Sequence, residues 1–169
     1  MDRFLWGGTG VLTAILFAAR EPVRRAFFLL DGADLLIHEA GHPIFGLLGN
    51  QWLTAAGGTI LQLLMPLAFW RDFRRRDQPR SALVCLAWVG QNFLHIGRYA
   101  ADARAQDLPL VGGGVHDWTY LLETVGLLTH DIGVGMTFDL IGCALIAYSV
   151  ASLIRPGPAE ITPRTTASS

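Results

Sequence analysis

Charge is scarce in this chain, and lysine is absent from it. Only 16% of the 169 residues are charged, and all 13 basic residues are arginines. Because soluble domains carry about 25% charged residues, a chain this poor in charge and 51% hydrophobic is expected to lie in a membrane. Its formal net charge of −1 argues against a nucleic-acid partner, since such proteins carry a surplus of positive charge.

Cysteine is also rare, and both cysteines, Cys85 and Cys143, lie in apolar runs. A disulfide framework or a cysteine metal site needs several thiols in a recognisable spacing. We therefore expect both to act as small buried hydrophobic residues.

Long apolar runs predict an all-α, polytopic membrane protein with about five transmembrane helices. The run over 53–70 contains small residues at 55–58 and Pro66. Because glycine and proline disturb helix regularity, this run predicts a broken or re-entrant segment. A secretory signal peptide is the rival interpretation of the first run. The expected spans are residues 4–19, 26–49, 53–70, 81–101 and 133–154.

Arginines between the spans predict the orientation of the chain. They cluster at 20–25, at 71–80 and at 155. Five crossings place all three groups on one side, and the positive-inside rule makes that side cytoplasmic. We therefore expect a bacterial inner-membrane protein in contact with lipid, with its N-terminus outside and its C-terminus cytoplasmic. Residues 1–155 form one integral membrane domain in this interpretation, and 156–169 a disordered tail.

One stretch inside an apolar run, His38-Glu39-Ala40-Gly41-His42, carries ionisable side chains. Such side chains are costly in a membrane and usually indicate function there. Histidines at i and i+4 share one helix face and can bind one Zn²⁺ ion. Glu39 is turned about 100° away and could act as a general base on a water held by the metal. The alternative is two ordinary histidines on a helix.

A catalytic zinc site needs a third protein ligand, and three residues are candidates. His95 is expected at a depth in its helix similar to that of His38. Asp117 and His116 follow a glycine-rich stretch at 112–114 that could let the loop reach inward. Asp117 could otherwise be the N-cap of a short amphipathic helix over 119–129, and His95 a polar contact between helices. The zinc-site core then covers about residues 26–130.

Two further polar residues are candidates for supporting roles. Asp34 lies one turn before His38 and could accept a hydrogen bond from its second ring nitrogen; a helix cap or an interfacial carboxylate is the alternative. Gln62 follows the glycines of the interrupted run and could hold a substrate backbone by hydrogen bonds. It could equally join two helices.

The chain resembles the site-2 protease family of intramembrane zinc metallopeptidases. The resemblance lies in the His-Glu-Ala-Gly-His stretch at 38–42, in the Gly57-Gly58…Gln62…Pro66 segment and, loosely, in the 108–117 segment. Gln62 stands where the family usually has asparagine, and Trp118 where it has the glycine after its aspartate.

The resemblance implies a three-helix catalytic core whose zinc is held by two histidines and an aspartate, with a glutamate base. By position these are His38, His42 and Asp117, with Glu39 as the base. It thus implies hydrolysis of peptide bonds in membrane-embedded protein substrates. The alternatives are a membrane protein that binds metal without hydrolysis and a small transporter.

Overall fold

The computed structural model describes residues 28–110 and 116–154, and every regular element there is helical. The expected first span at 4–19, the arginines at 20–25, the glycine-rich stretch at 112–114 and the tail at 156–169 lie outside these residues. The helices are α2 (Phe28–Gly46), α3 (Gln51–Arg75), α4 (Pro79–Ala101), α5 (Asp117–Thr124), a short 3₁₀ turn (Leu128–His130) and α6 (Asp131–Ile154).

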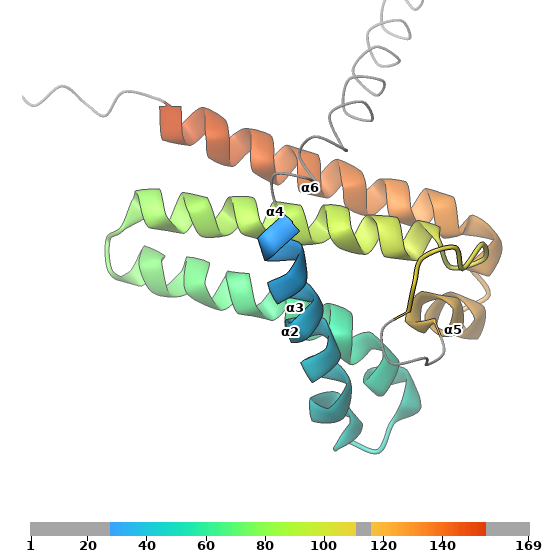
Figure 1. Ribbon diagram of the computed structural model, residues 1–169. Coiled ribbons are helices and arrows are strands. Elements are labelled where there is room, and N and C mark those ends of the chain that lie inside the picture. Colours follow the sequence, from blue (N-terminus) through green and yellow to red (C-terminus); the bar gives the residue numbers. More distant parts are fainter. Residues whose placement is uncertain (1–27, 111–115, 155–169) are drawn as a thin grey trace, which may run out of the picture.

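A tight turn joins α2 to α3, and α2 then crosses α3 (Figure 1). Gly49 takes a positive φ of 66°, a conformation that costs glycine little. The Asn50 side chain caps α3 by accepting the backbone N–H of Leu53. At the crossing, a Cβ on Gly41 would collide with the backbone of Gly57. Glycine at both positions therefore lets the two backbones approach closely.

The prediction of a broken or re-entrant segment is wrong, because α3 is one continuous helix of 25 residues with Pro66 inside it. A proline removes only one intrahelical hydrogen bond, and packing on both sides supports the helix. The small residues Ala56, Gly57 and Gly58 are buried. They serve the contact with α2 and do not interrupt the helix.

Helices α4 and α6 run alongside each other (Figure 1). Their contact depends on two glycine pairs. A Cβ on Gly142 would lie 2.6 Å from the Gly90 carbonyl oxygen, and one on Gly97 would lie 2.8 Å from that of Gly135. Small residues at such crossings are typical of helix packing in membranes.

Two helical segments are long and apolar enough to cross a membrane, Gln51–Arg75 and Leu128–Ile154, with mean hydropathies of 1.4 and 1.8. Only 28% and 11% of these apolar windows are buried within the protein. Large exposed apolar side chains on α6 include Met136, Leu140 and Val150. This pattern agrees with membrane association.

Candidate metal centre

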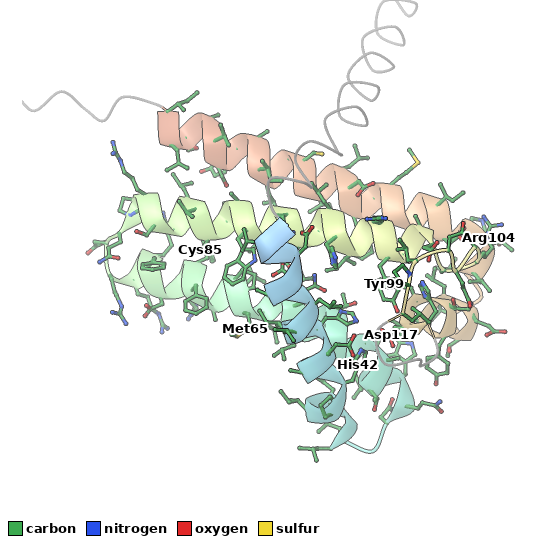
Figure 2. All side chains as sticks on the ribbon, in the orientation of Figure 1. His42, Met65, Cys85, Tyr99, Arg104 and Asp117 are labelled. Atoms are coloured by element: carbon green, nitrogen blue, oxygen red, sulfur yellow. The ribbon has the colours of Figure 1, made fainter. Side chains whose placement is uncertain are left out.

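His38 and His42 lie one helical turn apart on α2, and Asp117 lies at the start of α5. Figure 2 shows Asp117 beside His42. Asp117 Oδ2 lies 3.2 Å from His38 Nε2 and 3.4 Å from His42 Nε2. One ligand atom from each of the three residues lies within 4.8 Å of the others. Two imidazole nitrogens and one carboxylate oxygen therefore converge on one point that a metal ion could occupy.

The second nitrogen of each imidazole is held by a hydrogen-bond acceptor. His42 Nδ1 lies 2.9 Å from the Thr54 carbonyl oxygen, which can only accept, so His42 donates through Nδ1. His38 Nδ1 lies 3.1 Å from Gln62 Oε1 and donates to it. Because each Nδ1 donates, each Nε2 is the ring nitrogen that would offer its lone pair to a metal ion. Anchoring of this kind orients histidines for metal binding and raises their basicity.

Gly58 on α3 provides the space for the His38 ring. A Cβ there would lie 2.6 Å from His38 Nε2 and 2.7 Å from Cδ2 and Cε1. The glycine is therefore needed at the site, in addition to its place in the packing of α2 on α3.

A short helix follows the glycine-rich stretch as expected, but it spans Asp117–Thr124 and not 119–129, and its N-cap is His116 and not Asp117. His116 Nδ1 accepts the backbone N–H of Thr119, and its ring packs on Tyr99 with centroids 4.2 Å apart. Its Nε2 lies 3.5 Å from Asp102 Oδ2, and only 1% of the residue is exposed. These contacts direct His116 away from the cluster and leave the Asp117 carboxylate available as a ligand.

Tyr99 on α4 bonds to both the carboxylate and the backbone N–H of Asp117. Its hydroxyl donates to Asp117 Oδ2 at 3.3 Å and accepts the Asp117 backbone N–H at 3.3 Å. Burial opposes ionisation of Asp117, but its contacts with the two imidazoles outweigh burial and lower its pKa to about 2. The carboxyl group is therefore ionised, as a metal ligand must be.

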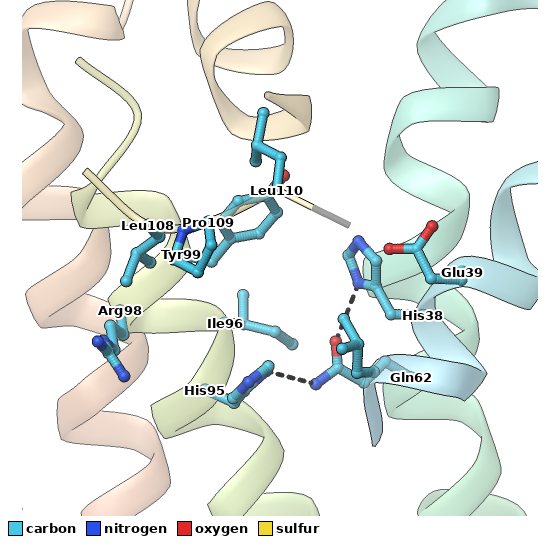
Figure 3. Close-up of a pocket in the computed structure, with 11 residues that line it drawn as sticks. His38, Glu39, Gln62, His95, Ile96, Arg98, Tyr99, Leu108, Pro109 and Leu110 are labelled. Atoms are coloured by element: carbon cyan, nitrogen blue, oxygen red, sulfur yellow. Dashed lines mark hydrogen bonds between the residues drawn. The ribbon is translucent and has the colours of Figure 1, made fainter. Parts of the chain in front are cut away.

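Glu39 borders a cavity of about 300 Å³ beside the cluster (Figure 3). Its side chain is half-buried and makes no ion pair with any residue in 28–110 or 116–154. Asp102 shapes one wall, because its carboxylate accepts the backbone N–H groups of Asp107 and Leu108. The cavity is lined by Leu35, His38, Glu39, Gln62, His95, Ile96, Arg98, Tyr99, Leu108, Pro109 and Leu110.

His95 does not join the cluster. Its Nδ1 lies 3.2 Å from Gln62 Nε2, which donates to it (Figure 3). Gln62 is 1% exposed and links His38 on α2 to His95 on α4. Its expected contact with substrate is not tested by these bonds, but both ends of its amide are already engaged. Its observed role is to join helices and hold His38.

The role expected for Asp34 at His38 is corrected, because Gln62 occupies that place. Asp34 Oδ1 instead accepts the Trp88 indole N–H at 2.9 Å and the Asn92 amide at 3.3 Å. Asp34 is fully buried, so it is neither a helix cap nor an interfacial carboxylate. Asp34 lies only one turn along α2 from His38, but its carboxylate faces α4.

Sequence reasoning did not identify Tyr99, Thr54 or Asp102. Tyr99 follows His95 by four residues and so shares its helix face, a signal that could have identified it. Thr54 contributes a backbone carbonyl, which no side-chain pattern reveals.

Comparisons of the chain with protein-family models, with curated proteins and with solved structures found no match.

Proposed function

We propose that this protein is an intramembrane zinc metallopeptidase that hydrolyses peptide bonds in membrane-embedded substrates, as its resemblance to the site-2 protease family implies. The convergence of His38, His42 and Asp117 beside Glu39 carries the proposal. A site for metal storage or structure would not need a carboxylate base at the edge of a cavity. Glu39 beside the cluster therefore favours hydrolysis.

The donor set fits zinc. Imidazole nitrogens and a carboxylate oxygen are common zinc ligands, and three protein ligands with one open position are typical of catalytic sites. The hydrogen bonds on both Nδ1 atoms leave the Nε2 atoms as the ligand atoms. Tyr99 would keep Asp117 in place through its two hydrogen bonds.

Glu39 would be the general base of the reaction. When bound, zinc would polarise a water molecule and the substrate carbonyl. Glu39 would then accept the proton of that water and pass it to the leaving amine. The cavity offers mainly apolar walls to a substrate side chain next to the scissile bond, among them Leu35, Ile96 and Leu108.

The membrane arrangement belongs to the same proposal. About five crossings are expected, with the N-terminus outside and the C-terminus cytoplasmic in a bacterial inner membrane. Two candidate spans support membrane insertion. A substrate helix would have to unwind beside the site, because a helical peptide bond is shielded by its own hydrogen bonds.

The test is the substitution Glu39→Gln, which preserves size but cannot accept the proton. Full-length protein reconstituted in liposomes with a panel of single-span peptides should cleave at least one of them, as detected by mass spectrometry. Glu39→Gln should retain its zinc and lose cleavage by at least about 100-fold, the lower range for general-base catalysis. Glu123→Gln, an exposed glutamate on α5, is the matched control and should cleave normally.

Three outcomes would contradict the proposal. Cleavage by Glu39→Gln at the wild-type rate would exclude the proposed base. Zinc in wild type and variant with no cleavage by either would favour a metal-binding membrane protein. A wild-type protein without zinc would favour the transporter alternative.

A further inference from the structure

A second polar cluster lies between α2 and α4, apart from the zinc candidate. Asp31 and Asp34 are on one face of α2, and Trp88, Gln91 and Asn92 face them from α4. Gln91 Nε2 donates to Asp31 Oδ1 at 2.6 Å. Trp88 Nε1 and Asn92 Nδ2 donate to Asp34 Oδ1 at 2.9 and 3.3 Å. These bonds connect the helix that carries His38 to the helix that carries Tyr99.

Each donor nitrogen of this cluster makes a hydrogen bond, yet three of its oxygen atoms have no hydrogen-bond partner among residues 28–110 and 116–154. They are Asp34 Oδ2, Gln91 Oε1 and Asn92 Oδ1, and each is buried. The amides cannot simply be turned over, because each amide nitrogen already donates to a carboxylate, and Asn92 Nδ2 also donates to the Trp88 carbonyl at 3.0 Å. Buried acceptors without a partner are rare in proteins, and a bound ion is one recognised explanation.

Within the part of the chain that the structure describes, no positive charge compensates this cluster. Asp34 and Asn92 are 0% exposed and Gln91 is 5% exposed. No arginine or histidine among residues 28–110 and 116–154 forms an ion pair with either aspartate. An ionised carboxylate buried in this way is strongly disfavoured unless a positive charge accompanies it.

We propose that Asp34, Gln91 and Asn92, with Asp31 beside them, bind a small hard cation separate from the zinc candidate. A cation bound to Asp34 Oδ2 would supply its missing partner and neutralise the buried charge, and the amide oxygens of Gln91 and Asn92 are its further candidate ligands. Carboxylate and amide oxygens without nitrogen or sulfur donors suit Na⁺, Mg²⁺ or Ca²⁺ and are unlike the histidine-containing set around Asp117. The ion would fasten α2 to α4. This inference does not depend on peptidase activity.

The test measures thermal unfolding of the purified full-length protein, with zinc present, in choline chloride and in NaCl, MgCl₂ or CaCl₂ at equal ionic strength. We expect at least one of the three cations to raise Tm along a saturable curve, by roughly 5–10 °C at a hundred times its Kd. Asp34→Asn should abolish this rise. Asp72→Asn, which alters an exposed carboxylate paired with Arg76 on α3, should retain it.

Gln91→Met provides a second variant that removes one oxygen ligand and no charge. It should shift the midpoint of the cation titration at least about tenfold, and it keeps the proposal testable if Asp34→Asn does not fold. The proposal is overturned if no cation acts, or if Asp34→Asn responds as wild type does. It is also overturned if infrared spectra at neutral pH, under saturating cation, show a protonated carboxyl band that Asp34→Asn removes. A proton would then neutralise Asp34.

Discussion

Gly58→Ala should displace His38, a proposed zinc ligand, without altering any ligand chemically. The new Cβ would lie 2.6 Å from His38 Nε2, whereas ordinary contact begins at 3.4 Å, so the ring would have to move by their difference of 0.8 Å. Retreat of α3 from the ring would separate Gly57 from the backbone of α2 at Gly41 and press α3 against α4, so it is costly. Zinc–ligand distances tolerate only about 0.2 Å. The displacement therefore exceeds what the site can absorb.

We expect Gly58→Ala to weaken zinc binding about 10- to 100-fold, the range seen when the support of a zinc ligand is lost, or about 1.4–2.7 kcal/mol. Overpacking should also lower the free energy of unfolding by about 1–3 kcal/mol. Zinc affinity would be measured by competition with a chromophoric chelator and stability by thermal unfolding.

Gly32→Ala is the matched control for this prediction. Gly32 lies in α2, and a Cβ there would meet nothing within 4 Å. Zinc affinity should not change, and removing a helical glycine should raise stability by up to about 1 kcal/mol. If Gly58→Ala matched wild type in both measurements, the His38 ring could not lie against Gly58, and the geometry deduced for the site would be refuted.

Gln62→Leu removes the acceptor that orients His38 and should weaken zinc binding about 10- to 100-fold in a chelator competition. Asp34→Asn should change zinc affinity less than about twofold. If Asp34→Asn weakened zinc binding more than Gln62→Leu did, Asp34 would be the partner of His38. A single cysteine in the 76–78 turn between α3 and α4, in an otherwise cysteine-free variant, should react with an impermeant maleimide only after permeabilisation, and labelling of intact cells would exclude the proposed orientation. Gly142→Ala places a Cβ 2.6 Å from the backbone of α4 and should lower the free energy of unfolding by about 1–3 kcal/mol, which an unchanged Tm would contradict.

The zinc motif was readable from the sequence because it is local. His38 and His42 are four residues apart, and one helical turn places them together whatever the rest of the chain does. The same holds for the helical class, since long apolar runs form helices. Prediction from local sequence failed where small residues could either interrupt a helix or form its packing surface. Residues 55–58 predicted an interruption, but they are the contact surface of a continuous helix.

Contacts between distant segments depended on the tertiary structure. Asp117 is 79 residues from His38, and from the sequence alone His116 and His95 remained alternatives for its place. The structure distinguishes them because His116 caps α5 and packs on Tyr99, while His95 bonds to Gln62.

The directions of buried polar side chains depended on tertiary packing as well. Asp34 and His38 lie one turn apart on α2, so the sequence predicted that they interact. In the folded protein Asp34 bonds to Trp88 and Asn92, and His38 bonds to Gln62. The sequence by itself determined which ionisable groups enter the apolar helices. The packing of α3 and α4 against α2 decided their partners, because a buried polar group bonds to whichever donor or acceptor the neighbouring helix presents.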